Sequence, residues 1–322
     1  MRTFPKPILY VSKCLGFDHC RFNGQTISSE TVKMLAPFVE YHTVCPEVEI
    51  GLGVPRNPVR VVEAVGRQRL LQPGSELDCT DKMNRFTDSF LARIAEIDGW
   101  ILKSRSPSCG FVDVKVYPST GRVASTGKAK GLFGAKVVEK FETLGIEDEG
   151  RLTNFRIREN FFTKIFTFAA FREVKASNRM KELVRFQSEN KLLLMAQNQK
   201  EMRIMGRFVA NPDKRPFAAV VCDYEEHLRL AFRIAPRYTS NINVLLHAFG
   251  YFSKQLSVEE RRFFLDSLEL YRQNKVPLSV PNHLISALIV RFKNEYLKSQ
   301  TIFEPYPQAL VEITDSGKGR KM

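Results

Sequence analysis

The sequence has no long apolar run and no leader-like N-terminus. Its longest apolar stretch, Phe161 to Phe171, is interrupted by Lys164 and falls short of the roughly 18 residues of a membrane-spanning helix. The apolar run that follows Arg2 and Lys6 is also too brief for a signal peptide. We therefore expect a cytoplasmic protein with no membrane association.

Paired cysteines are also missing. No CxxC pair occurs, which excludes a zinc ribbon or a thioredoxin-like motif. In a chain of cytosolic character, isolated cysteines indicate a metal site or catalysis rather than disulfides. Five of the six lie in the first 110 residues. They are Cys14, Cys20, Cys45, Cys79, Cys109 and Cys222.

Positive charge is abundant but unevenly distributed. The 322 residues carry a formal charge of +14, yet residues 1–100 hold equal numbers of acidic and basic side chains. The whole surplus lies in residues 101–322, which favours a polyanionic partner, nucleic acid first. The simpler alternative is a soluble basic surface without a partner. The length itself indicates about two domains.

Strand and helix signals alternate in the first half of the chain. Strands are expected at 7–12, 40–44 and 100–103, with a further strand at 112–117, and helices at 29–38 and 81–97. This alternation is typical of a parallel sheet with helical crossovers.

The second half has helical periodicity instead. We therefore predict a Rossmann-like, three-layer α/β domain over residues 1–175 and a mainly α-helical domain over 176–322. The glycine-rich segment 121–134 is expected to be a flexible loop.

Three cysteines follow the first three predicted strands. Cys14 and Cys45 come directly after the first two, and Cys109 lies in the loop after the third. Because parallel strands end at one edge of a sheet, these thiols should converge where such sheets bind ligands. Zinc completed by His19 or Cys20, an iron–sulfur cluster with one open iron, and three packing residues all remain compatible with this pattern.

The sequence around these cysteines resembles the thiouracil desulfidase (TudS-like) family. The matching pieces are Val-Ser-Lys-Cys-Leu-Gly at Cys14, Cys-Pro-Glu-Val at Cys45 and Ser-Pro-Ser-Cys-Gly at Cys109, within a resemblance that covers roughly residues 5–170. Residues 180–310 resemble a YbgA-like helical domain, for example at Asn-Val-Leu-Leu-His-Ala-Phe-Gly-Tyr-Phe, residues 243–252.

This resemblance implies a 4Fe–4S cluster held by Cys14, Cys45 and Cys109, with one iron not ligated by protein. It also implies a non-redox desulfidase that converts a thiolated uracil base to uracil and releases sulfide. The substrate would be free base or thiolated RNA, and for this two-domain form 4-thiouridine in tRNA, with no stable protein partner. Family histidines around Gln187 and Gln197 are absent here, which weakens the RNA assignment.

Polar residues near the cysteines are candidates for catalysis. Glu47 follows Cys45 by two residues and is the predicted acid/base, and Ser106 is predicted to orient water or substrate. Arg56, Ser104 and Ser108 are the candidates for substrate binding.

Basic residues further along are candidates for RNA phosphates. Lys128, Lys130 and Lys136 lie in or near the glycine-rich segment, and a second group recurs every four residues as a predicted stripe on one helix. The members of that group are Arg229, Arg233 and Arg237. The alternative to an enzyme is an iron–sulfur or zinc RNA-binding sensor without catalysis.

Overall fold

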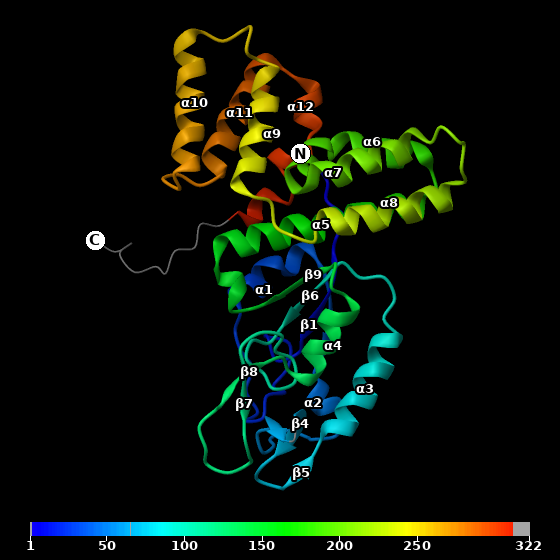
Figure 1. Ribbon diagram of the computed structural model, residues 1–322, viewed down its shortest axis with the longest axis vertical. Coiled ribbons are helices and arrows are strands. Elements are labelled where there is room, and N and C mark those ends of the chain that lie inside the picture. Colours follow the sequence, from blue (N-terminus) through cyan, green and yellow to red (C-terminus); the bar gives the residue numbers. More distant parts are fainter. Residues whose placement is uncertain (1, 65, 312–322) are drawn as a thin grey trace. The chain divides into compact units, whose positions relative to one another are not determined.

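The computed structural model describes residues 2–64 and 66–311, which form two compact units (Figure 1). The N-terminal unit contains the residues up to Ala169 together with those from Tyr306 onward, and the helical unit contains Ala170–Pro305. Helix α5 (Phe155–Ser177) runs through the division without a break, so the predicted boundary after residue 175 stays a prediction.

A four-stranded parallel sheet forms the centre of the N-terminal unit. Its order is β2 (Glu40–Val44), β1 (Ile8–Ser12), β6 (Gly99–Leu102) and β9 (Gly145–Asp148), and every neighbouring pair is parallel. The chain adds β2 on one side of β1 and β6 on the other, so the topology switches between β1 and β6. The predicted α/β fold class is confirmed.

Side chains that alternate along β1 and β6 pack against helices on both faces of the sheet. Leu9, Val11 and Ile101 belong to a core cluster shared with α1 (Glu30–Leu35) and α5. On the opposite face, Tyr10 packs edge-on against Phe90 of α3 (Thr80–Ala92), with ring centroids 5.6 Å apart. Helix α4 (Leu132–Lys140) covers that same face through Phe133. Since adjacent residues of a strand point to opposite faces, the strands are buried on both sides.

A second, mixed sheet was not predicted as a sheet, although its strand β7 lies within the strand expected at 112–117. Its order is β5 (Leu77–Asp78), β4 (Arg67–Gln72), β3 (Arg60–Ala64), β7 (Val114–Tyr117) and β8 (Gly127–Ala129). The expectation of a flexible loop over 121–134 is wrong in part, because β8 and the first turn of α4 lie within it.

The helical unit is almost entirely α-helical, as predicted. Helix α10 begins with a capping box, since Ser257 Oγ accepts from the Glu260 amide and the Glu260 carboxylate accepts from the Ser257 amide. In α7 the backbone of Asn198 leaves helical geometry, which divides that helix in two. The helices are α6 (Met180–Glu189), α7 (Lys191–Ala210), α8 (Phe217–Ala231), α9 (Tyr238–Gly250), α10 (Val258–Arg272), α11 (Ser279–Phe292) and α12 (Glu295–Ser299). None of the helices in the described residues is long and apolar enough to cross a bilayer.

Candidate active site at the cysteine edge

The three predicted cysteines lie at the carboxyl edge of the parallel sheet. Cys14 is two residues beyond β1, Cys45 directly follows β2 and caps the short helix α2 (Pro46–Glu49), and Cys109 is in the loop after β6. This edge includes the switch point between β1 and β6, where open α/β sheets bind their ligands. The elements around Cys109 and Cys45 leave these two side chains almost fully buried.

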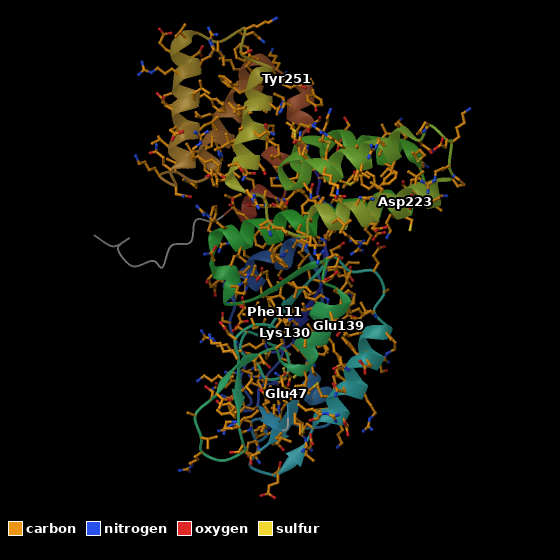
Figure 2. The ribbon with its side chains drawn as sticks, in the orientation of Figure 1. Glu47, Phe111, Lys130, Glu139, Asp223 and Tyr251 are labelled. Carbon is orange, nitrogen blue, oxygen red and sulfur yellow. The ribbon has the colours of Figure 1, made fainter. Side chains whose placement is uncertain are left out.

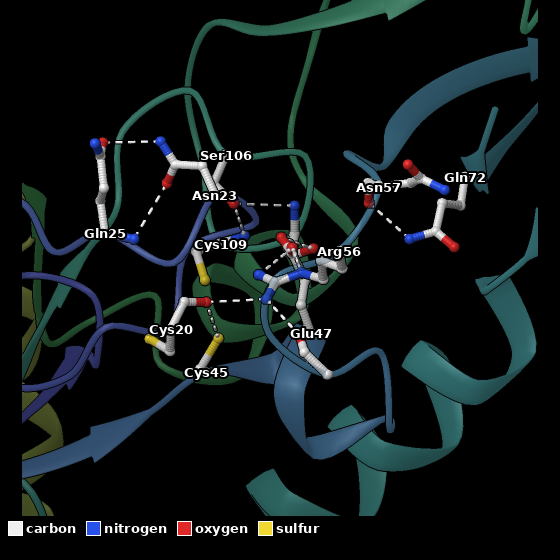
Figure 3. Close-up of polar contacts among 12 residues, drawn as sticks. Cys20, Asn23, Gln25, Cys45, Glu47, Arg56, Asn57, Gln72, Ser106 and Cys109 are labelled. Atoms are coloured by element: carbon white, nitrogen blue, oxygen red, sulfur yellow. Dashed lines mark hydrogen bonds and ion pairs between the residues drawn. The ribbon is translucent and has the colours of Figure 1, made fainter. Parts of the chain in front are cut away.

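A fourth thiol, that of Cys20, lies among them. It hydrogen-bonds with the thiols of Cys14 and Cys45, and its backbone carbonyl lies 3.8 Å from Cys45 Sγ (Figure 3). From the sequence, Cys20 was expected only as a possible ligand that would complete a zinc site. In the structure it is as buried as Cys45 and Cys109, whereas Cys14 is partly exposed.

Mutual contact and burial raise the pKa values of three of these thiols, those of Cys20, Cys45 and Cys109. The hydrogen bond with Cys14 raises the pKa of Cys20 to about 11, and the hydrogen bond with Cys20, together with burial, raises the pKa of Cys45. Burial raises the pKa of Cys109, against the opposing effect of the Ser12 and Ser106 hydroxyls. Several thiols at one place ionise together only when a bound cation compensates their charge.

The donor set fits a sulfur-liganded metal centre. Three or four soft sulfur atoms converge from separate loops, as iron–sulfur clusters and zinc both require. Across residues 2–64 and 66–311, however, no group of three or more His, Cys, Asp or Glu side chains is arranged to hold a metal ion as the chain stands.

Glu47 is held on both of its carboxylate oxygens. Arg56 donates from Nε and Nη2 to Oε2, at 2.9 and 2.7 Å, and Ser108 Oγ donates to Oε1 at 2.9 Å (Figure 3). The ion pair is buried, with 4 % of the Arg56 side chain and 12 % of the Glu47 side chain exposed. Figure 2 shows Glu47 on the short helix below the sheet edge. Its charge is therefore compensated, and its position is fixed beside the cysteines.

Arg56 links three segments of the site. Besides Glu47, its Nη1 donates to the carbonyl oxygens of Cys20 and Gly53, each at 3.0 Å. Its predicted contact with substrate is untested, but all of these donors are already engaged within the protein. The arrangement makes Arg56 a residue that positions Glu47 and the Cys20 loop.

The three candidate serines have different surroundings. Ser106 Oγ accepts from the amides of Ser108 and Cys109, at 3.3 and 3.1 Å, and shapes the turn that carries Cys109. Ser108 is fully buried against Glu47. Ser104 donates to Glu149 at 2.7 Å and accepts from Lys103, so it belongs to a separate ion-paired cluster at the end of β9.

The glycines before and within α4 have a role that the sequence analysis missed. The amides of Phe133 and Gly134 both donate to the Ser108 carbonyl at 3.0 Å, and the Gly131 amide donates to the Gly110 carbonyl. A Cβ on Gly134 would lie 2.4 Å from the Cys109 carbonyl oxygen. The first turn of α4 therefore packs directly against the Cys109 loop, and the glycine spacing was the available signal.

Most of the predicted RNA contacts are paired within the protein. Lys128 binds Asp113 at 2.8 Å and Lys136 binds Asp88 at 2.6 Å, whereas Lys130 is exposed just before α4 (Figure 2).

The predicted arginine stripe on one helix is wrong. Arg229 lies on α8 and binds Glu225, Arg233 follows the end of α8, and Arg237 caps α9. The four-residue spacing does not continue as one helix, because α8 ends at Ala231.

Comparison with known proteins identifies both parts of the chain. Residues 9–149 match the family model of the 2-thiouracil desulfurases, and residues 191–307 match that of a protein of unknown function, DUF1722. The uncharacterized protein YbbK of Bacillus subtilis is 33 % identical over 110 residues, which are 32 % of this chain and 73 % of YbbK. The chain therefore belongs to the 2-thiouracil desulfurase family, as the motifs predicted.

Two further relatives match parts of the chain. The uncharacterized protein YbgA of Escherichia coli is 27 % identical over 139 residues, which are 42 % of this chain and 80 % of YbgA. A solved structure, the [4Fe-4S]-dependent thiouracil desulfidase TudS, is 27 % identical with a TM-score of 0.36, and the match covers 46 % of this chain and 93 % of that one. The two family models and the match to YbgA show that a TudS-like desulfurase domain is fused to a YbgA-like domain, as predicted.

Proposed function

We propose that the protein is a desulfidase that replaces the sulfur of a thiolated uracil base with oxygen, most specifically in 4-thiouridine of tRNA. The observation that carries this proposal is the convergence of buried cysteines beside a fixed carboxylate, Glu47, at the switch point of the sheet. Membership of the 2-thiouracil desulfurase family supports the reaction class. The basic surplus of residues 101–322 supports an RNA substrate.

Cys14, Cys45 and Cys109 would hold a 4Fe–4S cluster, and its unligated iron would supply a Lewis acid for the thiocarbonyl sulfur. The net reaction adds water to the ring carbon and releases sulfide, so C=S becomes C=O without electron transfer. Glu47 removes a proton from that water and returns one to the departing sulfur or ring. Arg56 and Ser108 hold the carboxylate in place for both transfers.

Single Cys→Ser variants test the ligand set. We expect Cys14→Ser, Cys45→Ser and Cys109→Ser each to lose iron, labile sulfide and the brown colour, because a hydroxyl is a poor iron ligand. Their release of sulfide from 2-thiouracil or 4-thiouracil should fall with the cluster. Cys79→Ser and Cys222→Ser are the controls and should keep both. A fully loaded, active Cys109→Ser protein would overturn the assignment.

The buried thiol of Cys20 favours a second candidate function. If Cys20 closed the cluster as a fourth ligand, no iron would be open, and a sensor would fit better than an enzyme. Cys20→Ser separates the two functions. The desulfidase proposal expects the variant to retain cluster and turnover, whereas the sensor expects a cluster lost or converted to a three-iron form.

The RNA assignment is tested with the whole chain. Sulfide release is measured with thiolated tRNA and with the free thiolated bases, at two salt concentrations. The proposal expects turnover of tRNA that falls steeply with salt, since phosphate contacts release counterions. Turnover of the free base but not of tRNA would support the desulfidase activity and contradict tRNA as the substrate.

A further inference from the structure

One exposed sector of α7 carries only basic and uncharged side chains. Beyond the interruption at Asn198, Lys200, Arg203 and Arg207 project within about 60° of one another, at 100° per residue of α-helix. All three are exposed. The residues that share the sector, Gln199 and Ala210, are uncharged, so the row is positive along about 10 Å of helix.

These three side chains have no polar partner among the described residues of the protein. The acidic residue of this half of α7, Glu201, lies on the buried side and binds His227 at 2.5 Å. The candidates from the sequence analysis differ in this respect, because Lys128 and Lys136 already neutralise Asp113 and Asp88.

Three acidic residues on the neighbouring helices are also occupied. Glu182 of α6 binds Arg185, Asp223 of α8 binds Arg215, and Glu225 binds both Lys175 and Arg229. These carboxylates therefore do not neutralise the three cations of α7. A ligand that complements these cations carries a row of negative charges.

We propose that Lys200, Arg203 and Arg207 bind the phosphate backbone of the RNA substrate, an inference that rests on the proposed tRNA substrate. Successive cations rise about 4.5 and 6 Å along the helix, a spacing that lets each meet a separate phosphate of one strand. Such contacts fix the register of an RNA without reading its sequence. The helical unit would then hold the substrate by charge, while the base is processed at the cysteine edge.

A charge reversal with a matched control tests this. The triple variant Lys200→Glu, Arg203→Glu and Arg207→Glu is compared with Lys254→Glu, Lys275→Glu and Lys293→Glu, which alters three exposed cations elsewhere in the same unit by the same total charge. Binding of a fluorescent tRNA transcript is measured by anisotropy from 50 to 300 mM salt, and thermal unfolding establishes that both variants are folded.

We expect the α7 variant to bind at least about tenfold more weakly than the control, with a log–log salt slope shallower by about 2 to 3 because three phosphate contacts are lost. Equal weakening in both variants would overturn the proposal, since only net charge would then matter. Wild-type protein that binds phosphatidylserine vesicles but not tRNA would also overturn it. If wild-type protein turns over free base but does not bind tRNA, the proposed RNA substrate is wrong while the desulfidase activity stands. This outcome distinguishes failure of the proposed substrate from failure of the α7 proposal.

Discussion

Glu47 is constrained more tightly than a surface loop carboxylate. Arg56 binds one oxygen and Ser108 the other, and the three residues come from helix α2 and two separate loops. A carboxylate fixed in this way keeps its lone pairs in one direction, which is what repeated proton transfer at one point requires. Its chemical role can be separated from its structural one by an isosteric change.

We expect Glu47→Gln to retain its cluster and lose turnover by about 10²- to 10⁴-fold, because the amide keeps the shape but takes no proton. The measurement is sulfide release per cluster. Glu49→Gln, on the same short helix but exposed, is the control and should be unchanged. Full activity per cluster in Glu47→Gln would assign the proton to water or Ser106 instead.

At the scale of single residues, the sequence indicated the candidate site residues but not the residues that contact them. The strand-end cysteines and Glu47 follow from where parallel strands finish, so they could be chosen without coordinates. The pairing of Arg56 with Glu47 could not, because it depends on how the loop after α2 folds back. The placement of Cys20 depends on the loop after β1 in the same way.

The first turn of α4 acts as a support for the Cys109 loop. Its free amides satisfy carbonyls of that loop, and the close approach leaves no room for side chains at the contact. The helix N-terminus thereby fixes the third cysteine in place, although it contributes no ligand. The glycines at this contact are consequently structural requirements of the site.

Gly134→Ala should displace the Cys109 loop, since the new Cβ would meet a backbone oxygen at 2.4 Å. We expect a lower iron content and a thermal midpoint reduced by several degrees, in line with overpacking of about 1–3 kcal/mol. Gly127→Ala is the matched control, because nothing lies within 4 Å of its Cβ. If Gly134→Ala binds iron as well as Gly127→Ala, the support is unnecessary.

Helices and strands with a clear hydrophobic periodicity were predicted well from the sequence. Charge-rich strands and glycine-rich segments were not. The strand 40–44 was predicted with its observed bounds, since an extended run ends at Cys45-Pro46. The strands of the mixed sheet are rich in charge, for example at Arg67–Gln72, so their alternation was hidden. Glycines in 121–134 indicated flexibility, whereas their actual role is close packing.

The N-terminal unit is completed by residues that follow the helical unit in the chain. Tyr306 and Leu310 belong to the core cluster of the parallel sheet, and Tyr306 packs edge-on against Phe162 of α5 with centroids 5.5 Å apart. A truncation after α5 would therefore remove part of this core. The function of the helical unit should be tested by surface substitutions, as above.

We expect Leu310→Ala to destabilise the N-terminal unit by about 2–5 kcal/mol, the usual range for a buried leucine. Its side chain is 1 % exposed, although it lies far along the chain from the strand residues of its cluster, Leu9, Val11 and Ile101. Cluster content and chemical unfolding are the readouts. Gln308→Ala, exposed in the same segment, should match wild type. Equal stability of the two variants would show that the segment is dispensable.

The burial of Glu159 makes the stability of the protein depend on pH. Burial raises the pKa of Glu159 to about 7 from 4.5, against the opposing effects of the Tyr306 hydroxyl, Arg158 and Arg156. The folded protein therefore binds a proton between pH 4.5 and 7 that the unfolded chain does not. Its contribution to the free energy of unfolding is favourable below that window and is lost as pH rises through 7.

Glu159→Gln should remove this dependence, because the amide is neutral throughout. We expect a higher thermal midpoint than wild type at pH 8 and little difference at pH 5. Unfolding is followed by circular dichroism across that range. Glu139→Gln, exposed on α4, serves as the control and should follow the wild-type profile (Figure 2). If the thermal midpoint of Glu159→Gln varies with pH in the same way as that of wild type, the assignment of this pH dependence to Glu159 is wrong.

Because Tyr306 and Leu310 pack into the N-terminal unit, they also affect the order in which the protein folds during synthesis. Domains usually fold from the N-terminus as the ribosome makes them. Here the sheet and its cysteines are translated early, but the core beneath them closes only after the whole helical unit and residue 310 have emerged. The site proposed to hold the cluster is therefore completed late in synthesis, and a chain stalled within the helical unit carries an unfinished site.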